Sequence, residues 1–324
     1  MKSAGRFRHH SRMAYSAFMD YREVLVTGGT GFVGTHVCRA LIARGFLPRL
    51  LVRPESEGRI PADIREKGRI TLGDATDRES VENAVQGTSA VVHLVGIIRE
   101  FPARGITFER LHVAATRNVV DAAARWNIPR LVHMSALGAR AGGATGYFDS
   151  KGRAEEYVRQ SGLSWTVFRP SVIFGPGDQF LNELGRILSG APFIPVPGDG
   201  RYRLQPVFVG DVAKGFADAL LRPETEGRTF EVGGPEQLTY GELLDRLAAC
   251  TGCRARKIHV PLSILRPAVR RLERFEKFPL TTDQLEMLLA GNVCDNGPFY
   301  SAFRFAPLPL STYLSGGKAV LGVR

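Results

Sequence analysis

The stretch VLVTGGTGFVGTHV, residues 24–37, carries the strongest structural signal in this 324-residue chain. An apolar, β-branched run ends at a cluster of glycines, and a helical pattern follows at once. Gly29, Gly31 and Gly34 fit G-x-G-x-x-G, and Gly28, Gly31 and Gly34 fit G-x-x-G-x-x-G. Between a strand and a helix, such glycines permit a tight turn and the close approach of a pyrophosphate to the helix N-terminus. The stretch therefore predicts a dinucleotide-binding loop.

Five further β-branched runs alternate with helical patterns along the first half of the chain. The six predicted strands are EVLVT (23–27), RLLV (49–52), RITL (69–72), AVVHLV (90–95), RLVHMS (130–135) and WTVF (165–168). Most of these runs are apolar on both faces, as in a parallel sheet that helices cover on both sides. The series predicts an α/β fold, a doubly wound parallel sheet of the Rossmann type with right-handed crossovers.

The composition changes near residue 176, where Gly- and Pro-rich loops and then helical patterns replace the alternation. We therefore predict a dinucleotide-binding domain over 23–175 and a smaller C-terminal lid domain over 176–324. Within the second part, RTFEVGG (228–234) is expected to return to the main sheet as a strand. Asp211 is the expected N-cap of a helix that begins at GDVAKGF.

Composition narrows the classes of function. The formal charge of +11 favours anionic partners, but no zinc finger or aromatic-rich basic stripe indicates nucleic acid. The longest apolar run, AVVHLVGII (90–98), is far shorter than the roughly 20 residues of a membrane-spanning helix. Cys250 and Cys253 follow a helical pattern rather than precede one, so we expect ordinary buried thiols and no metal site. A cytoplasmic location is expected.

Residues 1–22 are basic and lack the apolar core of a secretory signal. We expect a disordered extension, with Met13 or Met19 as alternative first residues. An amphipathic targeting segment is the alternative interpretation.

Side chains after the second, third and fourth predicted strands indicate how a nucleotide would be held. Arg53 stands about 20 residues past the last glycine, where an NAD-selective site would usually carry an acid. We therefore expect NADP(H) to be preferred, with NAD(H) as the alternative. Asp74 is placed to accept from the adenine amine, and Gly96 permits close backbone approach. The candidate cofactor contacts along these motifs are Gly28, Thr30, Gly31, Phe32, Val33, Gly34, Arg53, Asp74, Ala75, Val95 and Gly96.

The stretch GYFDSKGRAEEY (146–157) holds a tyrosine and a lysine four residues apart, so Tyr147 and Lys151 share one helix face. A neighbouring ammonium stabilises a phenolate, and we expect Lys151 to lower the pKa of Tyr147 toward neutrality. The same ammonium can donate to ribose hydroxyls. Ser135, at the end of the fifth predicted strand, is placed to bind a substrate carbonyl. These three residues are the candidate catalytic group.

VTGGTGFVG, GDATD, YFDSK and RPSVIFGPGD together resemble an extended or atypical short-chain dehydrogenase/reductase of the epimerase/dehydratase superfamily. The resemblance implies that Tyr147 is the acid/base, that Lys151 binds ribose and that Ser135 orients the substrate. It also implies that Pro170 to Ile173 contact the nicotinamide end of the cofactor.

LVHMSALGA, FRPSVIFGPGDQFLN and LTTDQLEMLLAGNV resemble the accessory subunit of respiratory complex I and its free-standing bacterial relatives. That group binds NADPH, and its complex I member is thought to stabilise the assembly. The resemblance implies respiratory-complex or quinone-related partners.

Three functions remain open on the sequence. The first is a cofactor-bearing accessory protein, and the second is an NADP(H)-dependent reductase or dehydrogenase of a small carbonyl compound. The third is a sugar-nucleotide epimerase or dehydratase. Ala136 follows Ser135 where epimerases usually run several hydroxyl residues, which weakens both the third function and the serine assignment.

The segment VPLSILRPAVRRLERFEKF (260–278) predicts a basic amphipathic helix. The apolar residues at helical spacing are Leu262, Leu265, Val269, Leu272 and Phe275, and the basic residues are Arg266, Arg270, Arg271, Arg274 and Lys277. Either the helix packs on the lid with a solvated basic face, or residues 262–277 make peripheral contact with the inner membrane or with a partner.

Overall fold

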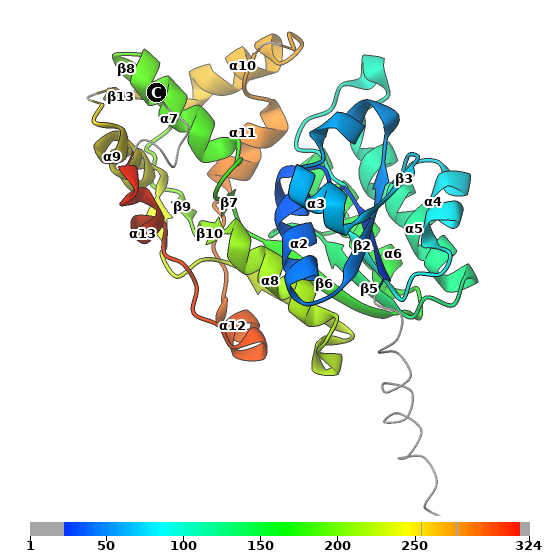
Figure 1. Cartoon of the computed structure of the whole chain (residues 1–324). Coiled ribbons are helices and arrows are strands. Elements are labelled where there is room, and N and C mark those ends of the chain that lie inside the picture. The colour runs from blue at the N-terminus through cyan, green and yellow to red at the C-terminus, as the bar shows by residue number, and fades with distance from the viewer. Residues whose placement is uncertain (1–22, 254, 277, 318–324) are drawn as a thin grey trace, which may run out of the picture.

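The computed structural model describes residues 23–317 except 254 and 277. The predicted N-terminal extension therefore lies outside the described residues. Seven parallel strands form the main sheet in the order β11-β6-β5-β4-β1-β2-β3 (Figure 1). These strands are β1 (Glu23–Thr27), β2 (Leu47–Val52), β3 (Arg69–Leu72), β4 (Ala90–His93), β5 (Arg130–Met134), β6 (Ser164–Pro170) and β11 (Arg228–Val232).

All six strands predicted in the first half are present, and the doubly wound parallel sheet is confirmed. Two of them end early: β4 stops at His93 and β5 at Met134, so the residues that follow them belong to loops. β11 lies beside β6, with Arg228 opposite Thr166. The chain changes direction across the sheet between β1 and β4. In open α/β sheets, ligands bind at the carboxyl ends of the strands near such a point.

Helices cover both faces of the sheet (Figure 1). Val24 and Val26 of β1 face the core beneath α2 and α8, whereas Leu25 faces the core beneath α4 and α5. This alternation follows from the twofold period of a strand. The helical segments of this region are α2 (Phe32–Ala43), η2 (Pro54–Arg59), α3 (Ala62–Lys67), α4 (Arg78–Val85), η3 (Pro102–Arg104), the π-helix η4 (Glu109–Ala114), α5 (Ala115–Arg125), α6 (Gly146–Arg159), α8 (Val209–Ala219), η5 (Pro223–Thr225) and α12 (Gly297–Phe303).

A cluster of phenylalanines joins the C-terminal half to the main sheet. The fully buried Phe168 of β6 has a ring centroid 4.8 Å from that of Phe216 on α8. The rings of Phe299 and Phe303 on α12 lie 5.7 Å and 5.6 Å from it. Because α8, β11 and α12 all pack there, the second half of the chain completes the main domain as well as forming the lid.

The lid has its own core of leucines and aromatic residues, centred on α7 and α9. Three short ribbons brace it: β7 with β10, β9 with β12, and β8 with β13. Its elements are β7 (Ile173–Phe174), α7 (Phe180–Gly190), β8 (Phe193–Pro197), β9 (Arg203–Leu204), β10 (Val207–Phe208), β12 (Leu238–Thr239), α9 (Tyr240–Thr251), β13 (Arg256–Val260), α10 (Leu262–Leu272), α11 (Thr282–Leu289) and α13 (Leu310–Leu314).

Two local expectations in this half are corrected. α8 begins at Val209, so Asp211 lies inside the first turn and does not cap the helix. Its buried carboxylate accepts instead from the backbone N–H of Leu308, at 2.8 Å. The predicted basic helix ends at Leu272, and Phe275 lies beyond its last turn. Lys277 lies outside the described residues. In the part of the chain that the structure describes, no helix has the length and apolar character needed to cross a bilayer.

The phenylalanine cluster predicts a large loss of stability when its centre is removed. Phe168→Ala should lower the free energy of unfolding by about 3–5 kcal/mol, because a buried ring is replaced by a cavity. Phe193→Ala is the matched control, since that ring is 49% exposed on β8. Chemical denaturation of both variants checks this, and equal losses in the two would contradict it.

Candidate functional site

The glycines of the predicted phosphate loop differ in whether a side chain would fit at each position. Gly28 has a φ of +77°, and a Cβ there would lie 3.0 Å from the backbone of Leu94 and Val95. At Gly34 a Cβ would lie 2.2 Å from the carbonyl oxygen of Gly28. Gly31 is exposed, and a Cβ there would meet only that carbonyl oxygen, at 3.3 Å. The fold therefore requires Gly28 and Gly34, whereas a side chain at Gly31 would meet only one atom of the protein itself.

The loop leads directly into the N-terminus of α2. Gly31 is the N-cap of this helix, and neither a side-chain cap nor an acid occupies its first turn. The first amides of a helix have no acceptor within the helix, and their positive end attracts anions. The remaining loop candidates, Thr30, Phe32 and Val33, lie along this turn. The arrangement suits a pyrophosphate, as the motif predicts.

Arg53 and Asp74 follow β2 and β3, at the same edge of the sheet. The Arg53 side chain is exposed, and its Nη1 lies 3.3 Å from Oε1 of Glu55. A ribose phosphate at this position would therefore compete with the Glu55 carboxylate for the guanidinium. Asp74 accepts through Oδ1 from the N–H of Thr76, at 2.8 Å. The neighbouring Ala75 is buried.

Lys151 extends from α6 to the carboxyl ends of β4 and β5. Its Nζ donates to the carbonyl oxygen of Met134 at 3.1 Å, and the carbonyl oxygen of Val95 lies 3.5 Å away. A Cβ on Gly96 would lie 2.8 Å from the same Nζ, so the absence of a side chain there makes room for the ammonium. Burial lowers the pKa of Lys151 to about 8. The structure thus brings Val95, Gly96 and Lys151 into direct contact.

The pKa of the Tyr147 phenol differs from the expected one. Burial raises the pKa of its phenol to about 12, so the expected lowering by Lys151 is wrong for this structure. The physical reason is its surroundings: the rings of Phe108, His112 and Phe148 stand edge-on to the tyrosine ring, with centroids 5.5–5.9 Å away. The lysine ammonium is bound to backbone carbonyls instead.

Ser135 follows β5 directly and is almost fully buried. Its N–H donates to the carbonyl oxygen of Phe168 at 2.8 Å, yet its hydroxyl has no hydrogen-bond partner in the described part of the protein. A buried hydroxyl without a partner is costly, and either a ligand group or an ordered water can satisfy it. Pro170 ends β6 beside this point, and Ile173 begins β7. Their assignment as nicotinamide contacts stays a prediction.

Sequence reasoning missed His112, which lies in η4. Its Nε2 accepts from the N–H of Ile97 at 3.0 Å, and its Nδ1 lies 2.8 Å from the Ser150 hydroxyl. Ser150 in turn donates to the carbonyl oxygen of Tyr147. Burial, with Lys151 nearby, lowers the pKa of His112 to about 2, so the ring stays neutral. The imidazole therefore links the loop after β4 to the first turn of α6, and no sequence motif indicated this contact.

Two contacts from the lid also reach the site, and both were missed. Oδ2 of Asp283, in the first turn of α11, accepts from the N–H of Tyr147 at 3.2 Å. Arg99, in the loop after β4, binds the carbonyl oxygens of Glu273 and Phe275 at 3.1 Å and also that of Phe278. Both contacts join residues more than 130 positions apart.

A nicotinamide dinucleotide fits these residues by chemistry. The open space at Gly31 and the free amides of α2 suit the pyrophosphate, and Lys151 can donate to ribose hydroxyls. The partnerless Ser135 hydroxyl suits an acceptor or donor on a ligand.

Comparison with known proteins agrees with this geometry. Residues 28–179 match the sequence model of a family described as NAD(P)H-binding. The alpha subcomplex subunit 9 of mitochondrial NADH dehydrogenase (ubiquinone) from Dictyostelium discoideum is 29% identical over 288 residues. That match covers 87% of this chain and 78% of the relative.

Two bacterial reductases match over similar lengths. Ceramide reductase of Caulobacter vibrioides is 28% identical, over 74% of this chain and 73% of its own. A ketoreductase of Stigmatella aurantiaca, named for a farnesylated dihydroquinoline oxide, is 29% identical, over 76% of this chain and 78% of its own.

Among solved structures, a nucleoside-diphosphate-sugar epimerase from Staphylococcus aureus superposes with a TM-score of 0.73 at 20% identity. The superposition covers 90% of this chain and 99% of the epimerase, and at this identity it shows a shared fold alone. Residues 28–179 therefore match the NAD(P)H-binding family, and most of the chain is similar to the alpha subcomplex subunit 9 of complex I and to two bacterial reductases.

Proposed function

We propose that this protein is a cofactor-bearing accessory protein that retains NADP(H) and works beside respiratory or quinone-related machinery. The observation that carries this proposal is the environment of Tyr147. Aromatic rings surround the tyrosine ring and the Lys151 ammonium binds a backbone carbonyl, so burial raises the pKa of the phenol, whereas general acid/base catalysis is most efficient when the pKa lies near the working pH. Lys151 remains placed to hold ribose, which a carrier needs as much as an enzyme does.

The lid contacts support retention of the cofactor. Arg99 binds three carbonyl groups of the segment 273–278, and Arg104 forms an ion pair with Glu276 of the same segment. Asp283 of α11 also accepts from the N–H of Tyr147 at the start of α6, so the lid is tied to the loop after β4 and to α6. A lid bonded on both sides of the nucleotide site slows release of a bound dinucleotide. The related complex I subunit supports a respiratory partner.

The Arg53 position supports NADP(H) over NAD(H). Its exposed guanidinium follows β2, where a ribose phosphate would lie. The nearby Glu55 carboxylate weakens but does not remove this preference, because Glu55 is itself exposed and its pair with Arg53 is a surface pair.

A second candidate function is an NADP(H)-dependent reductase of a hydrophobic carbonyl compound. It is favoured by the partnerless Ser135 hydroxyl and by the relationship to two reductases whose names specify a ceramide and a farnesylated ring. A reduced nicotinamide supplies the hydride for such a reaction. Ser135 would donate to the carbonyl oxygen, and the Tyr147 hydroxyl would give that oxygen its proton. Lys151 would hold the ribose and stabilise the phenolate that remains.

Gly31→Ala should separate binding from folding. The added methyl would lie 3.3 Å from a single carbonyl oxygen, so we expect only a small loss of stability, whereas the pyrophosphate would lose its close approach. We expect NADPH affinity to fall roughly tenfold or more, equivalent to about 1.4 kcal/mol, with the melting temperature nearly unchanged. Gly34→Ala is the contrast, because its methyl clashes with the loop backbone and should lower the melting temperature. Calorimetric titration and thermal denaturation measure both effects. Normal NADPH binding by Gly31→Ala would mean that the loop is misassigned.

Arg53→Asp should reverse the cofactor preference. A hydrogen bond to a charged group contributes about 1.5–3 kcal/mol, so the variant should bind NADPH roughly 10–100-fold more weakly and NADH no worse. Glu55→Gln is the matched control and should strengthen NADPH binding, because it frees the guanidinium. Calorimetry with both dinucleotides checks this. Wild-type preference for NADH, or an unaltered Arg53→Asp variant, would refute the assignment.

Tyr147→Phe distinguishes the two candidate functions, because it removes only the hydroxyl. A carrier should keep its NADPH affinity and its melting temperature. A reductase should lose turnover by about 10²–10⁴-fold. Lys151→Ala should impair both, and Tyr157→Phe, which removes an exposed hydroxyl of the same helix, is the control. NADPH oxidation by a ceramide-like or prenylated carbonyl compound that depends on the Tyr147 hydroxyl would overturn the accessory proposal.

A further inference from the structure

α10 carries apolar side chains on two opposite sides. On the inner side, Val269 is fully buried and Arg266 forms an ion pair with Glu286 of α11, at 2.8 Å. On the outer side, Ile264 is 64% exposed and Leu272 is 38% exposed. Phe275, just past the end of the helix, is 52% exposed. The outer side thus exposes Ile264 and Phe275 to solvent, with Leu272 partly covered between them.

Arginines flank these exposed side chains. Arg270, Arg271 and Arg274 form no ion pair with any described residue, whereas Arg266 on the inner side is paired. The guanidinium of Arg274 lies 4.8 Å from the ring centroid of Phe275, so the two project together. We call Ile264, Arg270, Arg271, Leu272, Arg274 and Phe275 the docking face.

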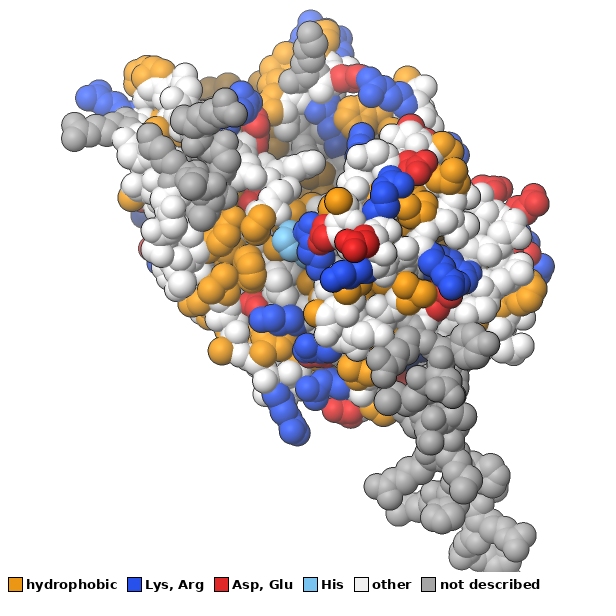
Figure 2. All heavy atoms as spheres, viewed as in Figure 1, with side chains coloured by type: hydrophobic (Ala, Val, Ile, Leu, Met, Phe, Trp, Pro, Cys, Tyr) orange, Lys and Arg blue, Asp and Glu red, His pale blue; other side chains and the backbone are white. Residues whose placement is uncertain are grey.

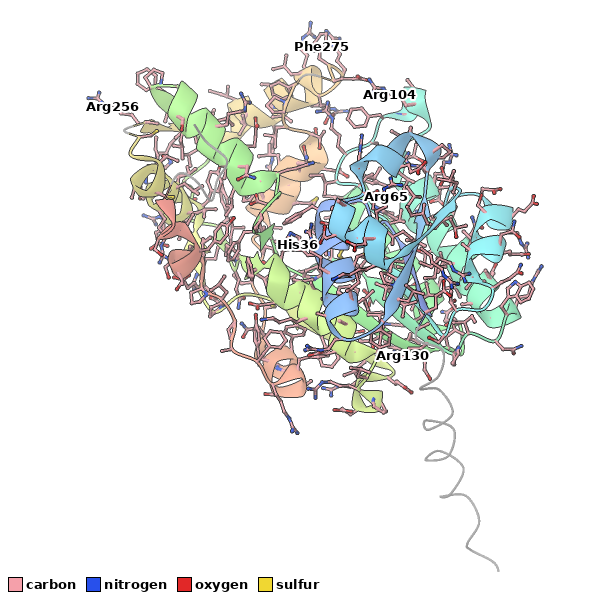
Figure 3. All side chains as sticks on the ribbon, in the orientation of Figure 1. His36, Arg65, Arg104, Arg130, Arg256 and Phe275 are labelled. Atoms are coloured by element: carbon pink, nitrogen blue, oxygen red, sulfur yellow. The ribbon has the colours of Figure 1, made fainter. Side chains whose placement is uncertain are left out.

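The segment that leads into α10 also exposes apolar side chains next to a basic one. Ile258 on β13 and Phe193 on β8 are 48% and 49% exposed, and Arg256 pairs in register with Phe193. Figure 3 shows Arg256 and Phe275 pointing away from the body of the protein at its upper margin. In Figure 2, hydrophobic and basic side chains meet along this upper edge.

We propose that the docking face binds the surface of a bilayer that contains anionic phospholipid. Apolar side chains on an exposed helix can enter the headgroup layer, while neighbouring arginines pair with lipid phosphates. The three arginines are positive and the neighbouring Glu276 is paired with Arg104, so the net charge of this edge is positive and complements an anionic surface. A stable protein interface needs roughly 1,000 Å² of matched area, whereas a bilayer accepts a narrow convex ridge.

The docking face lies next to the nucleotide site. Arg99 binds the carbonyl oxygens of Glu273 and Phe275, and its loop leads from β4 toward η4. Asp283 of the following helix contacts the backbone of Tyr147. Figure 1 shows α10 and α11 beside each other above the main sheet. Docking would therefore hold the lid and the site at the membrane. This inference goes beyond the proposed function and stands whether the protein is a carrier or a reductase.

Vesicle sedimentation of the full chain tests the proposal. We expect binding to phosphatidylcholine vesicles that contain phosphatidylglycerol, little binding to phosphatidylcholine alone, and weaker binding as NaCl is raised. Arg270→Gln with Arg271→Gln should weaken binding by about 25-fold, since each basic side chain near an anionic surface contributes about fivefold. Ile264→Ser with Phe275→Ser should weaken it by roughly tenfold or more.

Matched variants elsewhere control for charge and hydrophobicity. Leu72→Ser removes a side chain that is 53% exposed on β3, and Arg201→Gln removes an exposed cation of a lid loop; both should bind vesicles as the wild type does. The proposal is overturned if the wild-type protein does not bind anionic vesicles, or if the docking-face variants bind them as strongly as the control variants do. A dimer in sedimentation velocity that Phe275→Ser dissociates would assign the face to self-association instead. Since the readout is vesicle binding, its failure leaves the cofactor predictions untouched.

Discussion

The ammonium of Lys151, buried among the carboxyl ends of β4 and β5, is the interaction around which the site is arranged. A buried cation is costly unless polar groups face it, and here the carbonyl oxygens of Met134 and Val95 do so. The parallel sheet supplies these carbonyls because neighbouring strands end at the same edge. Gly96 leaves the space that Nζ occupies. Strand order, strand length and one missing side chain together allow a lysine to stand beside the nucleotide loop.

This cation influences the groups around it. His93 and His133 stack beneath it with ring centroids 5.3 Å apart, and burial followed by Lys151 lowers the pKa of His93 to about 3. His112 is neutral for the same two reasons, which lets it accept from the loop after β4 while its other nitrogen faces Ser150. The positive charge is thereby concentrated on Lys151, where it can meet ribose. Tyr147 lies among aromatic rings and keeps its proton. This arrangement is consistent with the proposed retention of a dinucleotide.

Around α10 and α11, the lid reaches the site through polar contacts. Arg99 and Asp283 connect the segment around α10 and α11 to the loop after β4 and to α6. Such contacts open at lower cost than a packed hydrophobic interface, so a ligand can enter while the main domain stays intact. The lid also leaves the outer face of α10 uncovered. The proposed nucleotide retention and the proposed surface docking would therefore depend on the same few helices.

The sequence by itself determined the kind of sheet, the position of the nucleotide loop and the residues at its strand ends. These features are local: Gly28 needs a positive φ, and strands apolar on both faces need helices on both sides. Tertiary structure decided the protonation and the contacts of the site residues. The high pKa of Tyr147, the carbonyl partners of Lys151, the link through His112 and the lid contacts of Arg99 and Asp283 each depend on segments far apart in the chain. Whether Leu272 and Phe275 face the core or the solvent was likewise decided by where α10 ends and by which side of it meets α11. Periodicity shows that a helix has an apolar face, but only packing shows what covers that face.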